Sequence, residues 1–165
     1  MEWREFFIER LDELRDRGDR AALAILRRGL GLESPELNFA AARYVVGNLP
    51  EGLSPWEVRN AYAVASLFAL HPQAGGVGNL GATIRLVRDP SESLEKRFMA
   101  MVDSESEDLL PHLRQLIGIL KSNDIPVDWL RLFKDLSYWG HQDRFVQRDW
   151  VSAFYTRKEK VDEVS

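Results

Sequence analysis

The chain of 165 residues has no cysteine, which excludes disulfide bonds and zinc sites built on thiolates. It also lacks any apolar run approaching the roughly 20 residues that a transmembrane helix needs. The first residues, Met1-Glu2-Trp3-Arg4-Glu5, are charged at once and have no apolar core of a secretory signal. These absences predict a cytoplasmic protein that does not enter a membrane.

Spacings that mark catalysis or metal binding are scarce as well. The three histidines, His71, His112 and His141, lie far apart in the chain. The acidic run 103–108 fits a helix start, where the helix dipole favours carboxylates, better than a cation site. No nucleophile, base and orienting group converge by spacing, which leaves a small nucleotide hydrolase as a weak rival. The sequence predicts no enzyme activity, metal, cofactor or small-molecule substrate.

Residues 76–81 form a literal G-x-G-x-x-G. That pattern binds dinucleotide phosphates only where a strand precedes it and a helix follows. Here the preceding residues, 64–70, read as the end of an amphipathic helix. We therefore interpret the glycine-rich segment as a flexible turn.

Apolar residues recur with the helical period along almost the whole chain, and no segment alternates as a strand does. The aromatic residues after 128 follow inward stripes and are expected to pack in the core. Capping patterns mark five helix starts, at Asp19, Ser34-Pro35, Ser54-Pro55-Trp56-Glu57, Ser104-Glu105-Ser106-Glu107 and Pro126. The predicted fold is all-α, a compact multi-helix bundle of about eight helices.

We expect a single helical domain over residues 1–160, followed by a disordered tail at 161–165. If the domain is divided, the boundary lies near 103–106 and gives halves 1–102 and 103–160. The sequence contains neither a repeat of fixed period nor a low-complexity linker, so nothing in it argues for a further division.

The charge is unevenly distributed, although the net charge is −4 and the isoelectric point is near 5.5. Residues 109–160 carry nine basic and six acidic side chains, so the C-terminal third is net positive. Arginine outnumbers lysine 17 to 5, and a guanidinium can bind phosphate through two hydrogen bonds. Arg131 has Asp128 and Asp135 at helical spacing, so we interpret it as an internally paired surface residue.

Seven other basic residues are candidates for a nucleic-acid-binding surface. Arg114 and Lys121 are seven residues apart and therefore share one face of a helix. Arg144 and Arg148 are four apart, a like-charge pair that costs stability unless an anion lies opposite. Two arginines in the last turn of an expected helix could equally interact with its dipole. The candidates are Arg27, Arg28, Arg114, Lys121, Lys134, Arg144 and Arg148.

An ordered set of segments resembles the CasB family, the small subunit of the type I-E CRISPR surveillance complex Cascade. The similarity covers roughly residues 20–155. Its first segments are Arg27-Arg28-Gly29-Leu30-Gly31, Leu67-Phe68-Ala69-Leu70-His71-Pro72 and Asn79-Leu80-Gly81. Its later and more specific segments are Leu94-Glu95-Lys96-Arg97-Phe98, His112-Leu113-Arg114-Gln115-Leu116, Ile125-Pro126-Val127-Asp128-Trp129, Asp135-Leu136-Ser137-Tyr138-Trp139 and Val146-Gln147-Arg148-Asp149-Trp150.

This resemblance implies a non-catalytic helical protein present as two copies along the belly of the complex. It implies contacts with crRNA, target DNA, the backbone and large subunits and a second copy of itself. The implied role is to steady the R-loop, including the displaced strand, during antiviral defence. Base pairing between the guide RNA and the target DNA recognises the target sequence. Such a subunit therefore needs only basic groups that contact the nucleic-acid backbone. The alternative is a purely structural scaffold whose basic face meets acidic protein instead.

Overall fold

The computed structural model describes residues 2–88 and 90–156, which fold into eight α-helices and five short 3-10 helices without a strand. The α-helices are α1 (Trp3–Asp16), α2 (Arg20–Arg27), α3 (Pro55–Leu70), α4 (Leu80–Ile84), α5 (Glu92–Asp103), α6 (Leu109–Ser122), α7 (Trp129–Ser137) and α8 (Phe145–Tyr155). The 3-10 helices are η1 (Arg28–Gly31), η2 (Pro35–Leu37), η3 (Phe39–Ala41), η4 (Val46–Asn48) and η5 (Ser106–Asp108). The all-α prediction is confirmed, whereas the expected tail at 161–165 lies outside the described residues.

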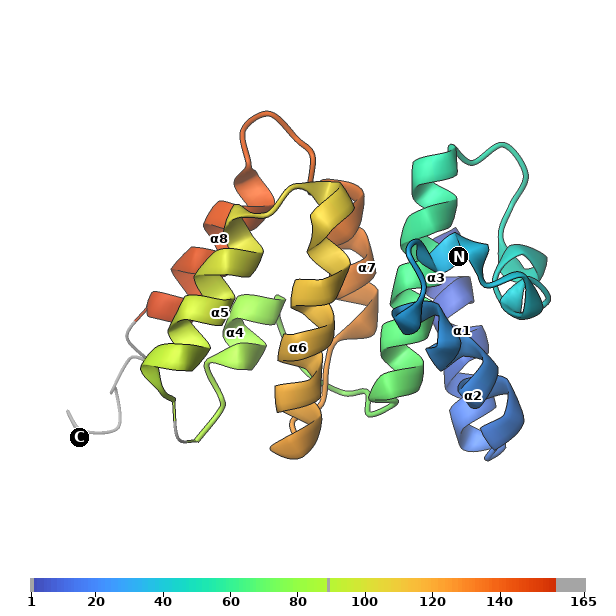
Figure 1. Ribbon diagram of the computed structural model, residues 1–165, viewed down its shortest axis with the longest axis horizontal. Coiled ribbons are helices and arrows are strands. Elements are labelled where there is room, and N and C mark those ends of the chain that lie inside the picture. The colour runs from blue at the N-terminus through green and yellow to red at the C-terminus, as the bar shows by residue number, and fades with distance from the viewer. Residues whose placement is uncertain (1, 89, 157–165) are drawn as a thin grey trace.

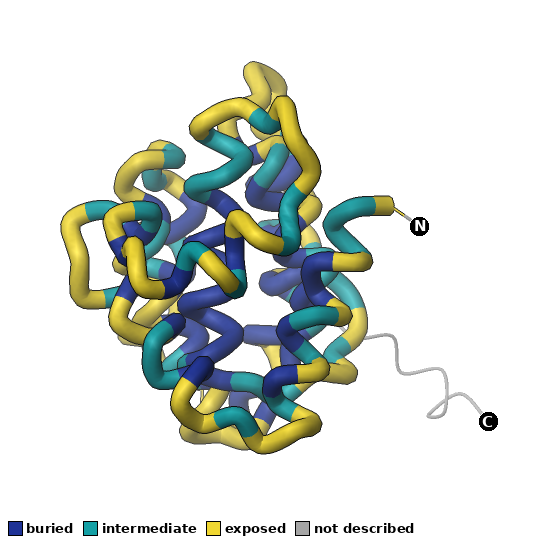
Figure 2. The backbone as a smooth tube through the Cα atoms, turned by 90° about the vertical axis from the view of Figure 1, so that its right-hand side faces the viewer, coloured by how far each residue is buried: buried dark blue, intermediate teal, exposed yellow. Residues whose placement is uncertain are grey.

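The helices are arranged side by side, with α1, α2 and α3 at one end of the molecule and α4, α5 and α8 at the other (Figure 1). Helices α6 and α7 lie between them, and both contact α3. One continuous hydrophobic core runs from Phe7 in α1 to Trp150 in α8. The exposed residues concentrate on the outer turns and connections (Figure 2). The division near 103–106 stays a prediction.

Helix α3 is the central element of this core. Its first turn has the predicted capping box, in which the Ser54 hydroxyl accepts from the Glu57 amide at 3.1 Å and the Glu57 carboxylate accepts from the Ser54 amide at 3.2 Å. Every residue from Asn60 to Ala69 is buried, so the helix is enclosed on all sides. In the part of the chain that the structure describes, no helix is long and apolar enough to cross a membrane.

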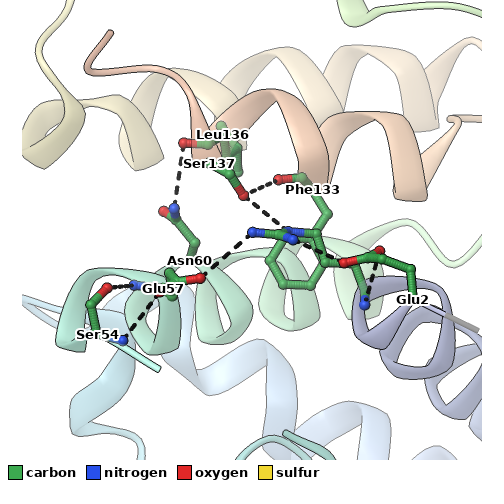
Figure 3. A network of polar contacts seen from close by, with 8 residues as sticks. Glu2, Ser54, Glu57, Asn60, Phe133, Leu136 and Ser137 are labelled. Atoms are coloured by element: carbon green, nitrogen blue, oxygen red, sulfur yellow. Dashed lines mark hydrogen bonds and ion pairs between the residues drawn. The ribbon is translucent and has the colours of Figure 1, made fainter. Parts of the chain in front are cut away.

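A polar network joins α1, α3 and α7 (Figure 3). The Arg4 guanidinium donates to the Ser137 hydroxyl at 3.1 Å and lies 3.7 Å from the Glu57 carboxylate. The Asn60 side chain donates to the Leu136 carbonyl at 3.4 Å. These contacts fix α7 against the N-terminal helices and complement the apolar packing beneath them.

The helix expected after Ser34-Pro35 does not form. The segment contains only η2, η3 and η4, and the Ser34 side chain makes no capping bond. The buried Asn38 side chain instead donates to the Ile25 carbonyl at 2.8 Å and holds the chain against α2. Phe39 is 77% exposed and not part of the core. A tertiary hydrogen bond therefore overrides the local capping pattern here.

Two further expected helix starts are displaced. Ser104 does not begin a capping box, because its hydroxyl donates to the Met101 carbonyl at 2.6 Å and the chain continues into η5 before α6 begins. Helix α7 begins after Asp128 rather than at Pro126, since the Asp128 carboxylate accepts from the Arg131 amide at 3.0 Å. The proline lies just outside the helix.

The glycine-rich segment is packed closely rather than free. A Cβ on Gly76 would lie 2.5 Å from the Pro126 carbonyl oxygen, and a Cβ on Gly81 would overlap the Trp150 carbonyl. The Val127 amide also donates to the Gln73 carbonyl at 3.1 Å. The G-x-G-x-x-G pattern therefore reflects close backbone approach, and its interpretation as a flexible turn is corrected at these two positions.

This packing predicts opposite effects for two glycine substitutions. Gly81→Ala forces a methyl group into the α8 backbone and should lower the free energy of unfolding by about 1–3 kcal/mol or more. Gly118→Ala, within α6 and with open space around its Cβ, should raise it by up to about 1 kcal/mol through helix propensity. Urea unfolding of both variants checks this pair, and a neutral Gly81→Ala would contradict the close α4–α8 contact.

Candidate nucleic-acid interface

All seven predicted cationic residues are exposed. Among the described residues, none of the seven lies within 4.0 Å of a carboxylate. Other arginines do have such partners, for example Arg10 with Glu13 at 2.6 Å and Arg15 with Asp12 at 3.0 Å. The predicted set therefore consists of cations that form no ion pair with an acid in the described chain.

Three of the five guanidinium groups in this set are held by backbone carbonyls. The donor–acceptor pairs are Arg27 with Ala69 at 3.3 Å, Arg114 with Leu30 at 3.0 Å and Arg144 with Val102 at 2.8 Å. A carbonyl carries no net charge, so the bond fixes the side chain without cancelling its positive charge. The remaining donors of each guanidinium can still meet a phosphate oxygen.

The bond from Arg114 to Leu30 places α6 beside η1. Arg28 opens η1, and Arg27 is the last residue of α2 immediately before it. The structure thus brings these three arginines to one junction. Lys121 is exposed farther along α6, where it lines a separate hollow with Arg15 and the buried His71.

Arg144 and Arg148 line a groove between α5 and α8. Its floor is apolar, formed by Met99, Val102 and Val151, while Asp103 and Asp143 bring negative charge to the same groove. Arg144 adopts a left-handed backbone conformation with φ of 52°, which is uncommon for a residue other than glycine. Lys134 is exposed on α7, a helix that carries none of the other six candidates.

Two cations next to these groups were not among the sequence candidates. Lys96 and Arg97 are exposed on α5 and line a hollow shared with His112 and Gln115 of α6. Because α5 contacts both α6 and α8, they stand between the two arginine groups. Their position opposite the buried stripe of Leu94, Phe98 and Met101 was the signal that could have identified them.

The prediction for Arg131 is confirmed for one of its two partners. Its guanidinium lies 3.2 Å from the Asp135 carboxylate, whereas Asp128 binds the Arg131 backbone amide instead. Asp135 is buried and also accepts from the Trp150 indole at 2.7 Å. Burial raises the pKa of Asp135, and the Trp150 hydrogen bond and the Arg131 charge offset this only in part. This buried contact joins α7 to α8.

Of the three histidines, His71 has a clear structural contact. His71 is buried, with Nε2 2.6 Å from the Ile125 carbonyl, so it joins the end of α3 to the turn after α6. Within residues 2–88 and 90–156, no group of three or more His, Asp or Glu side chains is placed to hold a metal ion.

These features define a small all-α protein with exposed cationic side chains on α2, α5, α6, α7 and α8. Residues 22–155 match the family model for the CRISPR-associated protein Cse2, so the chain belongs to the Cse2 family. It is 33% identical over 150 residues to the CRISPR-associated protein Cse2 of Thermus thermophilus, covering 87% of this chain and 86% of that protein. The resemblance to the CasB family drawn from the sequence is thereby confirmed.

Solved structures agree with this assignment. The crystal structure of CasB from Thermus thermophilus superposes with a TM-score of 0.84 at 28% identity, over 95% of this chain and all of that one. A chain of a CRISPR RNA-guided surveillance complex superposes with a TM-score of 0.74 at 27% identity, over 92% of this chain and 90% of that one. The family and the helical fold are therefore shared.

The buried Asp135 predicts a specific pH dependence of stability. Because its pKa is raised in the folded protein, its favourable contribution is complete below the ordinary value of 3.8 and declines as the pH rises through the raised pKa. Asp135→Asn removes this titration. The free energy of unfolding of wild type relative to this variant should therefore fall as the pH rises from about 3.8 toward neutrality.

Urea unfolding between acidic and neutral pH measures this difference. A constant difference between wild type and Asp135→Asn would contradict the raised pKa.

Proposed function

We propose that this protein is the small subunit of a CRISPR RNA-guided surveillance complex and that it binds nucleic acid without catalysing a reaction. The observation that carries the proposal is its membership of the Cse2 family together with its match to a chain of such a complex. In this proposal its partners are crRNA, target DNA, the backbone and large subunits and a second copy of itself.

The proposed role is to stabilise the R-loop, including the displaced DNA strand. Strand exchange between a DNA duplex and an RNA–DNA duplex is nearly balanced, so modest protein contacts to the backbone can decide it. The exposed guanidinium and ammonium groups over α5, α6 and α8 suit such contacts. Their attraction to phosphate does not depend on base sequence.

The alternative function is a scaffold that contacts other subunits but no nucleic acid. The carbonyl bonds of Arg27, Arg114 and Arg144 favour it to some extent, because those side chains also stabilise the fold. The two functions differ in their response to salt. Phosphate contacts release counterions and depend on salt with a slope set by their number.

Removal of charge from Arg114, Lys121, Arg144 and Arg148 tests the phosphate contacts. Alanine at all four should weaken R-loop formation by the assembled complex about equally for all target sequences. The slope of log affinity against log salt should fall by roughly 0.7 to 0.9 for each lost contact, hence by about 3 for all four. The measurement is a salt titration of R-loop formation, with folding and assembly of the variant verified first.

The matched control is alanine at Arg17 and Arg131, which are also on the surface but lie within 4.0 Å of carboxylates. This variant should keep the slope of wild type, because neither guanidinium is among the proposed phosphate contacts. Its folding is verified first, since Arg131 pairs with the buried Asp135. An unchanged slope for the quadruple variant would reject this surface and favour the scaffold.

We further expect no nuclease or nucleotidase activity with Mg²⁺, Mn²⁺ or Zn²⁺. Phosphate hydrolysis by metal ions needs converging carboxylate or imidazole ligands, which neither the sequence spacing nor the described residues supply. Incubation of the purified protein with DNA, RNA and nucleotides in each metal checks this. Turnover that survives purification to homogeneity would overturn the non-catalytic assignment.

A further inference from the structure

The connection between α2 and α3 exposes several apolar side chains in succession. Leu37 is 46% exposed, Phe39 77% and Val46 50%. Arg43 is the only charged residue between positions 37 and 50, although 29% of the whole chain is charged. The 37–50 surface consists of the exposed residues of this stretch, Leu37, Phe39, Ala40, Arg43, Val46, Gly47 and Pro50. Exposed apolar groups gathered in this way mark a site of contact with another molecule.

The surface is fixed from the inner side of the same segment. Asn38, Ala41 and Val45 are buried between the exposed positions, and the Asn38 side chain is bonded to α2. The Ala41 amide donates to the Asn38 carbonyl at 3.0 Å and the Val45 amide to the Ala41 carbonyl at 3.1 Å. The inward positions are therefore occupied, and the fold itself directs Phe39 outward. A surface ordered in advance loses little conformational entropy when a partner binds.

Phe39 differs from the other exposed aromatic residues. The Arg10 guanidinium covers the Phe6 ring at 4.6 Å, Tyr138 lies against the Phe145 ring, and the Tyr155 hydroxyl donates to Glu95 at 2.7 Å. Within residues 2–88 and 90–156, no aromatic ring and no cation is stacked on Phe39. Its apolar area therefore gains the most from burial by a partner.

The charges around the surface do not favour a polyanion. Glu33 and Glu51 are exposed on either side of the segment, and Glu36 lies 3.6 Å from Arg59. Helices α1 and α2, on which η4 and η3 pack, expose charges of both signs. In Figure 1 the segment lies at the right-hand end of the molecule, away from α5 and α8. An apolar surface with one cation and acidic flanks is complementary to protein rather than to nucleic acid.

Arg43 indicates which kind of protein fits. Its guanidinium lies 5.3 Å from the Tyr44 ring centroid, and no carboxylate of the described chain lies within 4.0 Å of it. Two copies of this chain related by a two-fold axis through the surface would bring their Arg43 side chains together, and like charges at an interface are unfavourable. A different protein with a carboxylate opposite Arg43 avoids this repulsion.

We propose that the 37–50 surface binds an apolar segment of a neighbouring subunit that is a different protein, with Phe39 inserted among its apolar side chains and Arg43 paired with one of its carboxylates. The proposal rests on the proposed function as a subunit of a complex and adds the surface and the chemistry of the contact. Aromatic side chains and arginine are enriched among the interface residues that contribute most to binding.

The first test is binding of the full-length chain to an immobilised complex that lacks this subunit, in the absence of target DNA. Phe39→Ala should weaken binding about 30-fold or more, as the loss of a central aromatic contact does. Its midpoint of urea unfolding should stay that of wild type, because the ring lies outside the core. The matched control is Val77→Ala, which removes a side chain that is also exposed but lies outside the surface. This control should bind as wild type does.

The charge of Arg43 is tested separately. Arg43→Glu should weaken binding about 10-fold or more, because it places two carboxylates together, whereas Arg43→Lys should keep most of the affinity. To identify the partner, Phe39 is replaced by the photoreactive p-benzoylphenylalanine in the assembled complex, and the peptide crosslinked on irradiation is sequenced by mass spectrometry. We expect an apolar peptide of another subunit that contains Asp or Glu. Exchange of that acid for lysine should restore the binding of Arg43→Glu.

The outcomes separate the two proposals. A wild-type chain that does not bind the rest of the complex overturns the proposed function and the docking surface together. Wild-type binding that Phe39→Ala leaves unchanged, or that Val77→Ala weakens equally, overturns the docking surface alone. A crosslink to a second copy of this chain or to crRNA, or no crosslink at all, overturns the assignment of the partner. Equal losses for Arg43→Lys and Arg43→Glu overturn the pairing with a carboxylate.

Discussion

The enclosure of α3 is the constraint on which the rest of the structure depends. A helix that is buried on every side can be contacted closely only if many of its residues are small, and α3 has alanines at 61, 63, 65 and 69 and a serine at 66. The close approach also requires glycine in the partner, because a Cβ on Gly29 would lie 2.5 Å from the Ser66 hydroxyl oxygen. Helices α2, α6 and α7 all pack on α3, so its dimensions set the distance between the two ends of the molecule.

The parts of the fold that were predictable depend on interactions close in sequence. The capping box at Ser54 and the cap at Asp19 involve residues three apart, and both form as expected. The segment after Ser34 fails because its decisive contact joins Asn38 to Ile25 in α2. Likewise, the tight packing of Gly81 depends on a backbone carbonyl 69 residues away in α8, which the spacing of glycines cannot reveal.

The same distinction applies to the cationic side chains. Arg131 and Asp135 are one helical turn apart in the sequence, so the spacing of residues could identify their pairing. The pairing of Arg59 with Glu36 joins separate elements, and the carbonyl partner of Arg114 is 84 residues away. Sequence spacing could show that Arg114 and Lys121 share a helix face, but it could not show that η1 lies beside one of them. Nor could it place Lys96 and Arg97 between the two arginine groups.

The net charge of −4 is compatible with a phosphate-binding surface because charges act locally in salt solution. At physiological ionic strength the Debye length is about 8 Å, so exposed charges farther apart are largely screened. Several N-terminal acidic residues are already neutralised, as in the pairs of α1 between Arg10 and Glu13 and between Arg15 and Asp12. A phosphate approaching α5, α6 or α8 therefore responds mainly to the charges close to it, which in the groove of Arg144 and Arg148 include Asp103 and Asp143. Acids farther away contribute only weakly to the electrostatic interaction with the phosphate. The distribution of charge, and not its sum, therefore decides where a polyanion can bind.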